Sequence, residues 1–200
     1  MKHILFILFI LLSSTALAQH WTVEAEDASN SSISWKGNEA DIIASKGLTL
    51  WFDEKMTGNT VIEYEAQIVK DKRFRDQSGA PRISDLNCFW MADRMLGRQG
   101  ASFPDYYALQ MYYVGYGGNW NTTTRFRRYT GDDRGISNPA FRPLILREYT
   151  DPDHLLKPNH WYKIRLEQID GRVRYFIDGE CLVDYIDPQP LHSGYFGFRT

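Results

Sequence analysis

An aromatic and amide cluster surrounds two consecutive glycines, Gly117 and Gly118, near the middle of the chain. A sugar presents apolar ring faces edged by hydroxyl groups, and aromatic rings beside amides complement both features. Strand-rich cores also contain many aromatic residues, so packing is the alternative role for each tyrosine. From this cluster we expect Tyr113, Trp120 and Asn121 to contact a saccharide. The whole cluster comprises Tyr112, Tyr113, Tyr116, Asn119, Trp120 and Asn121.

Arginine residues gather directly after this cluster and in a polar loop that precedes it. Arg125 and Arg127 are two positions apart on an expected strand, so their side chains share one face. A guanidinium group binds a carboxylate through two parallel hydrogen bonds, which favours a carboxylate-bearing ligand at this patch. An ordinary solvated strand face, balanced by nearby carboxylates, is the alternative. The whole group contains Arg73, Arg75, Arg82, Arg125, Arg127, Arg128 and Arg134.

Two polar residues begin a strand that is otherwise apolar. Asp85 and Asn87 point to one side of this strand, opposite the apolar side chains at positions 86, 88 and 90. Such a pattern is expected at the floor of a binding groove or at a hydrated strand edge. We include both residues among the expected ligand contacts, together with Arg125 and Arg127.

The same residues could support catalysis by β-elimination on a uronate. This reaction needs a group that neutralises the carboxylate, a base and an acid. Arg82 or Arg125, with Asn87, is suited to the first role. His160 or Tyr113 is suited to the base or the acid, because positioned side chains can transfer protons. A lone histidine before a strand, however, is more often structural.

Glu63 and Glu65 could instead support glycoside hydrolysis. Residues two apart on a strand share one face, with side chains about 7 Å apart, and paired carboxylates are the usual groups for this reaction. Sandwich glycosidases of the laminarinase type carry the spacing Glu-x-Asp-x-x-Glu, which this strand lacks, so a solvated face is favoured. The chain has no metal-ligand spacing, nucleophile elbow or phosphate-binding glycine loop.

Short alternating segments must position these side chains. Residues 61–69 alternate most clearly, with apolar side chains at 62, 64, 66 and 68 and polar ones between them, as in a strand that buries one face. Single helical turns are expected at 94–98 and 153–156, and long loops at 70–84 and 131–142. The expected strands are 20–26, 41–45, 47–52, 61–69, 85–92, 106–116, 119–129, 161–169, 172–178, 180–186 and 194–199.

These elements predict an all-β protein, an antiparallel β-sandwich of jelly-roll type. Residues 19–200 are expected to form a single domain, with the two long loops at the mouth of a concave sheet. Residues 1–18 are expected to be a signal peptide, because a basic start is followed by the apolar run 4–12 and by Ala16-Leu17-Ala18. This run is too short to span a membrane. We therefore expect an exported protein, periplasmic or extracellular.

Charge and cysteine content narrow the function classes further. The formal net charge of −2 becomes −3 without Lys2, which disfavours nucleic acid and anionic membranes as partners. Only Cys88 and Cys181 are present. Both lie in apolar strand patterns, so buried free thiols are favoured over a disulfide, and no thiol or metal chemistry is expected.

Three segments resemble a known family. The chain is similar to the YesU-like group of exported bacterial proteins, which have a concanavalin-like (lectin/glucanase) jelly-roll fold and accompany the breakdown of pectic and other acidic polysaccharides. The resemblance covers most of residues 61–200 and implies a further strand after Thr200, so that the chain would lack its last strand. The segments are 82–92 (RISDLNCFWMA), 124–129 (TRFRRY) and 194–200 (GYFGFRT).

Together these observations predict an exported carbohydrate-active protein that recognises an acidic, uronate-containing, pectin-like polysaccharide in bacterial polysaccharide degradation. A polysaccharide lyase acting by β-elimination on the same face is the alternative, and a glycoside hydrolase is less favoured. A purely structural envelope protein would leave the clustered aromatic residues without a role. The sequence leaves open whether the protein is an enzyme, which sugar and linkage it takes, its oligomeric state, and whether it holds a structural calcium; no other cofactor is expected.

Overall fold

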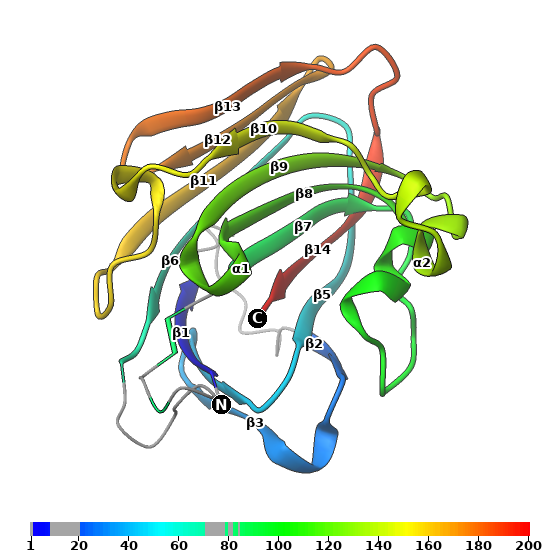
Figure 1. Ribbon diagram of the computed structural model, residues 1–200. Helices are drawn as coiled ribbons and strands as arrows, with labels where there is room; N and C mark the ends of the chain where they lie inside the picture. Colours follow the sequence, from blue (N-terminus) through cyan, green and yellow to red (C-terminus); the bar gives the residue numbers. More distant parts are fainter. Residues whose placement is uncertain (1, 9–20, 71–78, 80–81, 84) are drawn as a thin grey trace.

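The computed structural model describes residues 2–8, 21–70, 79, 82–83 and 85–200. Two seven-stranded antiparallel sheets lie face to face, which confirms the predicted β-sandwich (Figure 1). Sheet A contains, in spatial order, β13 (Glu180–Ile186), β12 (Arg172–Ile177), β11 (Tyr162–Ile169), β6 (Thr60–Ile68), β1 (Lys2–Leu8), β4 (Glu39–Ala44) and β3 (Ser31–Lys36). Sheet B contains β10 (Ile145–Tyr149), β9 (Thr123–Thr130), β8 (Gln110–Gly117), β7 (Leu86–Ala92), β14 (Ser193–Arg199), β5 (Leu48–Thr57) and β2 (Trp21–Ala25).

Strand β6 has the one-sided burial that its alternation predicts. Tyr64, Ala66 and Ile68 are buried in the main core between the sheets, whereas Glu63 is exposed on the outer face. Because only apolar side chains gain by leaving water, the period of two fixes which face turns inward.

Strand β7 differs from β6 because both of its faces are buried. Cys88 and Trp90 enter the main core, while Phe89 points to the outer face of sheet B. There it joins a second, smaller core with Trp51 and Tyr106. The segment that contains η2 (Phe103–Ala108) supplies much of this second core and therefore covers part of the outer face of sheet B.

Strand β1 consists of residues that the sequence predicts to be a removable leader. It lies between β4 and β6, with Lys2 opposite Ala44 and Leu8 opposite Tyr64. The structure thus gives this segment backbone partners on both sides. Cleavage after Ala18 stays a prediction, and residues 9–20 lie outside the described part of the chain.

The expected hairpin around Gly117-Gly118 is wrong in its details. Strand β8 begins only at Gln110, because the residues before it form η2, and β9 begins at Thr123 rather than 119. Between them, α1 (Gly118–Asn121) is a single turn with left-handed backbone angles. Asparagine tolerates these angles better than most residues do, which accounts for the sequence of the turn.

Other local expectations also need correction. Residues 94–98 do not form a helical turn, and only η4 (Pro152–His154) overlaps the turn expected at 153–156. The loop 131–142 contains α2 (Arg134–Ser137) and η3 (Pro139–Phe141), and the chain also forms η1 (Ala28–Asn30). Strands β3 and β10 were not expected, because both are largely exposed edge strands with weak apolar patterns.

The two cysteines differ in exposure. Cys88 is buried, as predicted, but Cys181 is exposed on edge strand β13; both thiols are free.

Candidate functional site

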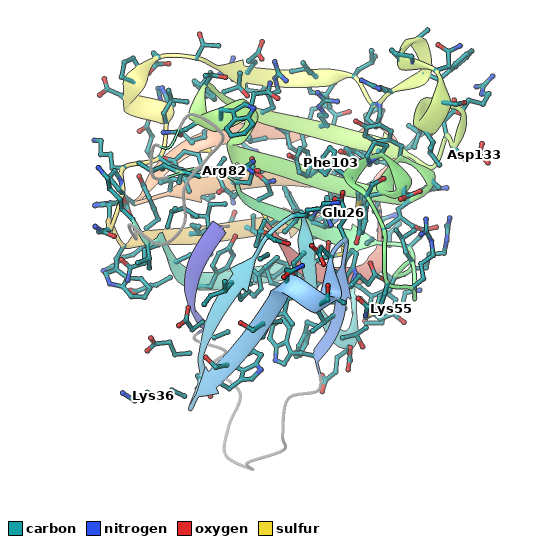
Figure 2. The ribbon with its side chains drawn as sticks, turned by 60° about the horizontal axis from the view of Figure 1, so that its bottom comes forward. Glu26, Lys36, Lys55, Arg82, Phe103 and Asp133 are labelled. Carbon is teal, nitrogen blue, oxygen red and sulfur yellow. The ribbon has the colours of Figure 1, made fainter. Side chains whose placement is uncertain are left out.

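A hollow of about 560 Å³ lies on the outer face of sheet B, beside the second core. Strands β7, β8, β9 and β14 form its floor. Its walls are the η2 segment, the α1 turn and the connection between β4 and β5. Figure 2 labels Glu26, Arg82 and Phe103, all of which line the hollow, on the same part of the molecule, with Lys36 far from them. We call this hollow the pocket.

Nine residues are expected from the sequence to contact the ligand or to serve the lyase reaction, and seven of these nine line the pocket. They come from four separate segments: the end of the 70–84 loop, β7, β8, and α1 with β9. Asn121 and His160 do not line it. Arg73 and Arg75 lie outside the described residues. The seven are Arg82, Asp85, Asn87, Tyr113, Trp120, Arg125 and Arg127.

Trp120 lies at the rim of the pocket, where its side chain is 56% exposed. Its backbone has φ 61° and ψ 40°, an unfavourable conformation for a bulky residue. The guanidinium carbon of Arg82 lies 4.4 Å from the centre of a Trp120 ring, a cation–π arrangement. The indole is therefore held in place and still open to solvent.

Asn121 holds the α1 turn rather than lining the pocket. Its amide nitrogen donates to the Leu156 carbonyl over 2.9 Å, and its amide oxygen accepts from the Leu156 N–H over 2.8 Å. These two bonds tie the left-handed turn to the segment before β11. Asn121 is adjacent to Trp120 and does not line the pocket, so its expected contact with a saccharide stays a prediction.

Tyr113 lies on the pocket floor with its hydroxyl above Gly115. A Cβ atom on Gly115 would come within 2.2 Å of that hydroxyl oxygen, so glycine is required to leave room for it. Burial raises the pKa of Tyr113 well above its ordinary value, although nearby Arg127 and Arg199 act in the opposite direction. The phenol is therefore protonated at neutral pH and is suited to donate a hydrogen bond.

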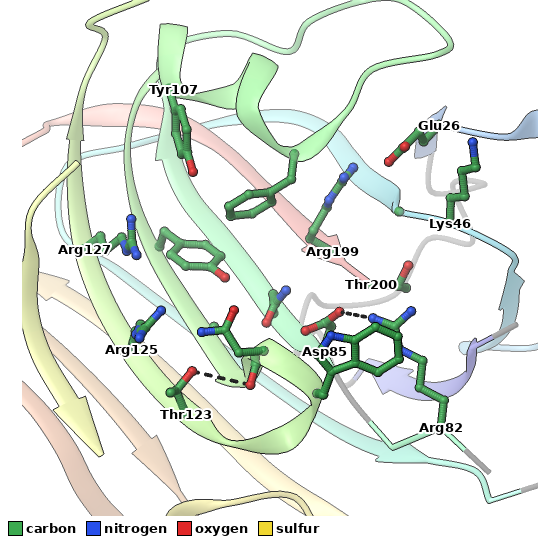
Figure 3. Close-up of a pocket in the computed structure, with 18 of the residues that line it drawn as sticks. Glu26, Lys46, Arg82, Asp85, Tyr107, Thr123, Arg125, Arg127, Arg199 and Thr200 are labelled. Carbon is green, nitrogen blue, oxygen red and sulfur yellow. Dashed lines mark hydrogen bonds and ion pairs between the residues drawn. The ribbon is translucent and has the colours of Figure 1, made fainter. Parts of the chain in front are cut away.

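Two of the expected arginines already have carboxylate partners. Arg125 pairs with Glu148 on β10 over 2.5 Å. Arg82 pairs with Asp85 over 3.3 Å, as Figure 3 shows. Arg82 thus links the Trp120 ring to Asp85 at one side of the pocket.

Three further polar groups in the pocket include atoms without a described partner. The buried Nε atoms of Arg127 and Arg199 and the buried Oδ1 atom of Asn87 form no hydrogen bond with any described residue. No local pattern in the sequence singles out Arg199, because it lies in the largely apolar closing segment GYFGFRT. Only the pairing of β14 with β7 brings it beside Asn87.

The remaining sequence candidates lie elsewhere. His160 stands just before β11 in sheet A, where its Nε2 atom is 2.9 Å from Asp178, so it is not available to chemistry in the pocket. Glu63 pairs with Arg165 over 2.5 Å on the outer face of sheet A. Arg128 points to the opposite side of β9 from Arg127 and pairs with Asp187 over 3.0 Å.

No group of three or more His, Cys, Asp or Glu side chains in the described part of the chain is arranged to hold a metal ion. No helix in the same residues has the length and apolar character that a membrane crossing requires.

Several solved structures share this architecture. A carbohydrate-binding module (CBM66) from Bacillus subtilis is 13% identical, with 90% of this chain and 86% of that chain covered and a TM-score of 0.53. A Bacillus subtilis protein of unknown function with a galectin-like fold is 16% identical, with 90% and 81% covered and a TM-score of 0.62. The exoplasmic/lumenal domain of VIP36, bound to Ca²⁺ and Man₃GlcNAc, is 13% identical, with 90% and 76% covered and a TM-score of 0.55.

These likenesses define the class of fold, a galectin-like or concanavalin-like β-sandwich. The chain belongs to the family described as a domain of unknown function (DUF6250), whose model matches residues 42–200. A search of curated proteins finds no significant match. The narrower YesU-like resemblance is not confirmed by these matches.

Proposed function

We propose that this protein is an exported carbohydrate-active protein whose pocket binds an acidic, uronate-containing polysaccharide. The observation that carries the proposal is Trp120, an exposed indole held in a left-handed turn at the rim of a polar pocket. A strained and exposed aromatic residue contributes little to the core, so a role in binding accounts for it best. An indole face is an apolar platform on which a sugar ring can stack.

The charges of the pocket support an acidic sugar. Six cationic side chains line it, against two carboxylates, although the chain as a whole has a formal charge of −2. A concave surface of one sign concentrates ligands of the other sign. The lining cations are Lys46, Arg82, Arg125, Arg127, Arg142 and Arg199, and the carboxylates are Glu26 and Asp85.

The similar structures support the saccharide part of this proposal. A carbohydrate-binding module and a lumenal domain bound to a mannose-containing glycan share the fold. Because one fold serves many functions, this likeness adds to the argument from the pocket and does not replace it. Export through the 1–18 leader, a pectin-like polymer and a setting in polysaccharide degradation belong to the proposal.

Replacement of Trp120 tests the proposal. We expect Trp120→Ala to lower the affinity of the full chain for polygalacturonate by roughly tenfold, as expected for loss of a stacking contact of about 1.4 kcal/mol. Affinity electrophoresis in polymer-containing gels measures this change. Trp35→Ala is the matched control, because Trp35 is 45% exposed on β3, outside the pocket. Equal affinities of the wild type and Trp120→Ala would refute the site.

A polysaccharide lyase is the second candidate, supported by the presence of Tyr113, Arg82 and Asn87 in one pocket. In β-elimination a base removes the C5 proton, the C4–oxygen bond breaks, and the leaving oxygen gains a proton. Protonated Tyr113 suits the acid, but the described lining residues include no histidine to act as the base. Ultraviolet absorbance of an unsaturated product would support a lyase, and its absence on several uronate polymers would exclude one.

Hydrolysis by Glu63 and Glu65 is less favoured. These residues lie on the outer face of sheet A, away from the pocket, and Glu63 is already paired with Arg165. New reducing ends without ultraviolet absorbance would restore this candidate. The nearby groove in sheet A would then be the place to examine.

A further inference from the structure

Arg199 is an almost completely buried cation without a direct counter-ion. Arg199 is 2% exposed, and its guanidinium group makes no ion pair with a described carboxylate. Its Nη1 atom donates to the Thr49 hydroxyl over 3.1 Å. Thr49 bonds to Tyr106 over 2.9 Å, and Tyr106 bonds to the buried carboxylate of Glu24 over 2.7 Å. Two hydroxyl groups therefore separate the two charges.

The space around Arg199 is built to hold its guanidinium group in this position. The guanidinium carbon lies 4.8 Å from the ring centre of Tyr106 and 5.8 Å from that of Phe103. A Cβ atom on Gly47 would come within 2.2 Å of Nη2, so only glycine leaves room for it. A buried cation that is fixed so firmly, lines the pocket and has no carboxylate partner among the described residues is suited to an anionic ligand.

Arg127 approaches the same part of the pocket from β9. Its Nη1 atom donates to the Pro143 carbonyl over 3.2 Å, and its buried Nε atom has no described partner. Tyr113 lines the pocket together with both arginines, and the positive charges of Arg127 and Arg199 act to lower the pKa of its hydroxyl. Asn87 adds an unbonded amide oxygen at the same floor.

These groups differ from two other arginines that line the pocket, Arg82 and Arg125. Arg125 and Arg82 are each paired with a carboxylate of the protein, so their charge is already balanced. Arg127 and Arg199 have no such partner among the described residues. Lys46 and Arg142 also lack a carboxylate partner among the described residues, but both are exposed to solvent. Arg199 is instead buried, and Arg127 has a buried Nε atom, so these two are the unbalanced cations at the floor of the pocket.

We infer that the floor of the pocket is a carboxylate subsite, in which Arg127, Arg199 and the Tyr113 hydroxyl bind the free carboxylate of one uronic acid residue. The side-chain amide of Asn87 forms a hydrogen bond with a sugar hydroxyl, and Trp120 stacks on a neighbouring sugar at the rim. This inference rests on the proposed function and adds to it that the protein distinguishes a free uronate from its methyl ester. A methyl ester is neutral and cannot form an ion pair with Arg127 or Arg199. Its methyl group also blocks hydrogen bonds to one of the two carboxyl oxygen atoms.

The test compares oligogalacturonate of defined length with the same oligomer fully methyl-esterified, by titration calorimetry on the full chain. We expect the ester to bind at least roughly 30-fold more weakly, as is usual when one partner of a buried charge pair is lost. Arg127→Gln should remove most of this preference. Arg199→Lys, which keeps the charge but loses the planar fork, should reduce it if the variant folds, which circular dichroism checks.

Two controls separate the subsite from general attraction to a polyanion. Arg165→Gln removes an arginine on the outer face of sheet A and should leave the preference unchanged. High salt screens exposed charges far more than buried ones, so the preference should persist there. Equal binding of acid and ester, or a preference that disappears in high salt, would overturn the subsite while leaving saccharide binding intact. No binding of any oligomer or polymer would instead refute the proposed function and the subsite together.

Discussion

Asp187 is a buried carboxylate whose hydrogen-bond partners all belong to the protein. Its carboxylate is 6% exposed and accepts hydrogen bonds from the Tyr112 hydroxyl, the Arg128 guanidinium and the Gln189 N–H over 2.7–3.0 Å. Arg199 is buried to a similar extent but has no carboxylate in direct contact. Because a buried charge without a partner is costly, this contrast supports a structural role for Asp187 and the proposed binding role for Arg199.

The stability of the fold should depend on the ionised form of Asp187. Burial alone would raise the pKa of Asp187, but hydrogen bonds from Gln189, Tyr112 and Arg128 outweigh it and hold the pKa below the ordinary value. The stabilisation is therefore complete above the unfolded pKa of about 3.9 and is lost as the pH falls through the lower folded pKa. We expect Asp187→Asn to reduce the free energy of unfolding by about 1–3 kcal/mol at neutral pH.

Urea denaturation at several pH values measures this effect. The difference between the wild type and Asp187→Asn should shrink as the pH falls below about 4. Asp184→Asn is the control, since Asp184 pairs with Arg172 at the surface, where ion pairs contribute little. A difference that is the same at neutral and at low pH would contradict the assignment.

The α1 turn links sequence to site at the scale of one element. It joins β8 to β9, and its three left-handed residues direct the indole of Trp120 to the pocket rim. Bonds between Asn121 and Leu156 fix the turn from outside. The geometry of the aromatic platform therefore depends on a residue that does not line the pocket.

Asn121→Ala should lower both stability and saccharide affinity. Loss of two hydrogen bonds to buried backbone is expected to cost about 1–3 kcal/mol of unfolding free energy, and a released turn no longer holds the indole. Asn159→Ala is a matched control, because Asn159 has φ 58° and bonds through its side chain to the Lys70 N–H over 2.8 Å, outside the pocket. Thermal denaturation should report a loss in both variants, and calorimetry a weaker affinity only in Asn121→Ala. Unchanged affinity in Asn121→Ala would show that the turn keeps its shape without this residue.

At the scale of the whole molecule, the two outer sheet faces have different roles. The outer face of sheet A carries charged pairs such as Arg165 with Glu63 and Arg172 with Asp184. The outer face of sheet B is covered in part by the η2 segment and its aromatic core, and the uncovered remainder is the pocket. The asymmetry arises because strands of sheet B, such as β7, bury both faces, whereas β6 in sheet A buries only one.

The place of β1 inside sheet A leads to a prediction about processing. Without residues 1–18, strands β4 and β6 lose the backbone partners that β1 gives them, and unpaired strand edges are destabilising inside a sheet. We expect a chain that begins at Gln19 to denature at a lower temperature than the full chain, as measured by calorimetry. Equal midpoints would show that the stable fold does not depend on β1.

Local patterns in the sequence were sufficient to predict the layered architecture. The alternation in β6 and β7 identifies which side chains face the core, because burial of apolar surface acts on each residue separately. The sequence does not predict edge strand β10, because an exposed strand has no alternation of buried and exposed residues. It does not predict the left-handed turn either, because residue types do not specify these backbone angles uniquely. The exposure of Cys181 followed from its place on an edge strand, which the pattern does not reveal.

By itself the sequence determined the β-sandwich and the residue types available for binding: an indole, amides and several arginines. Only the tertiary structure decided which of them meet. It brought Arg199 beside Asn87, placed Trp120 above Arg82, and left His160 on the other sheet. The physical reason is that strand pairing joins residues far apart in the chain, such as β14 with β7, and this pairing depends on the packing of the whole sandwich rather than on any local pattern.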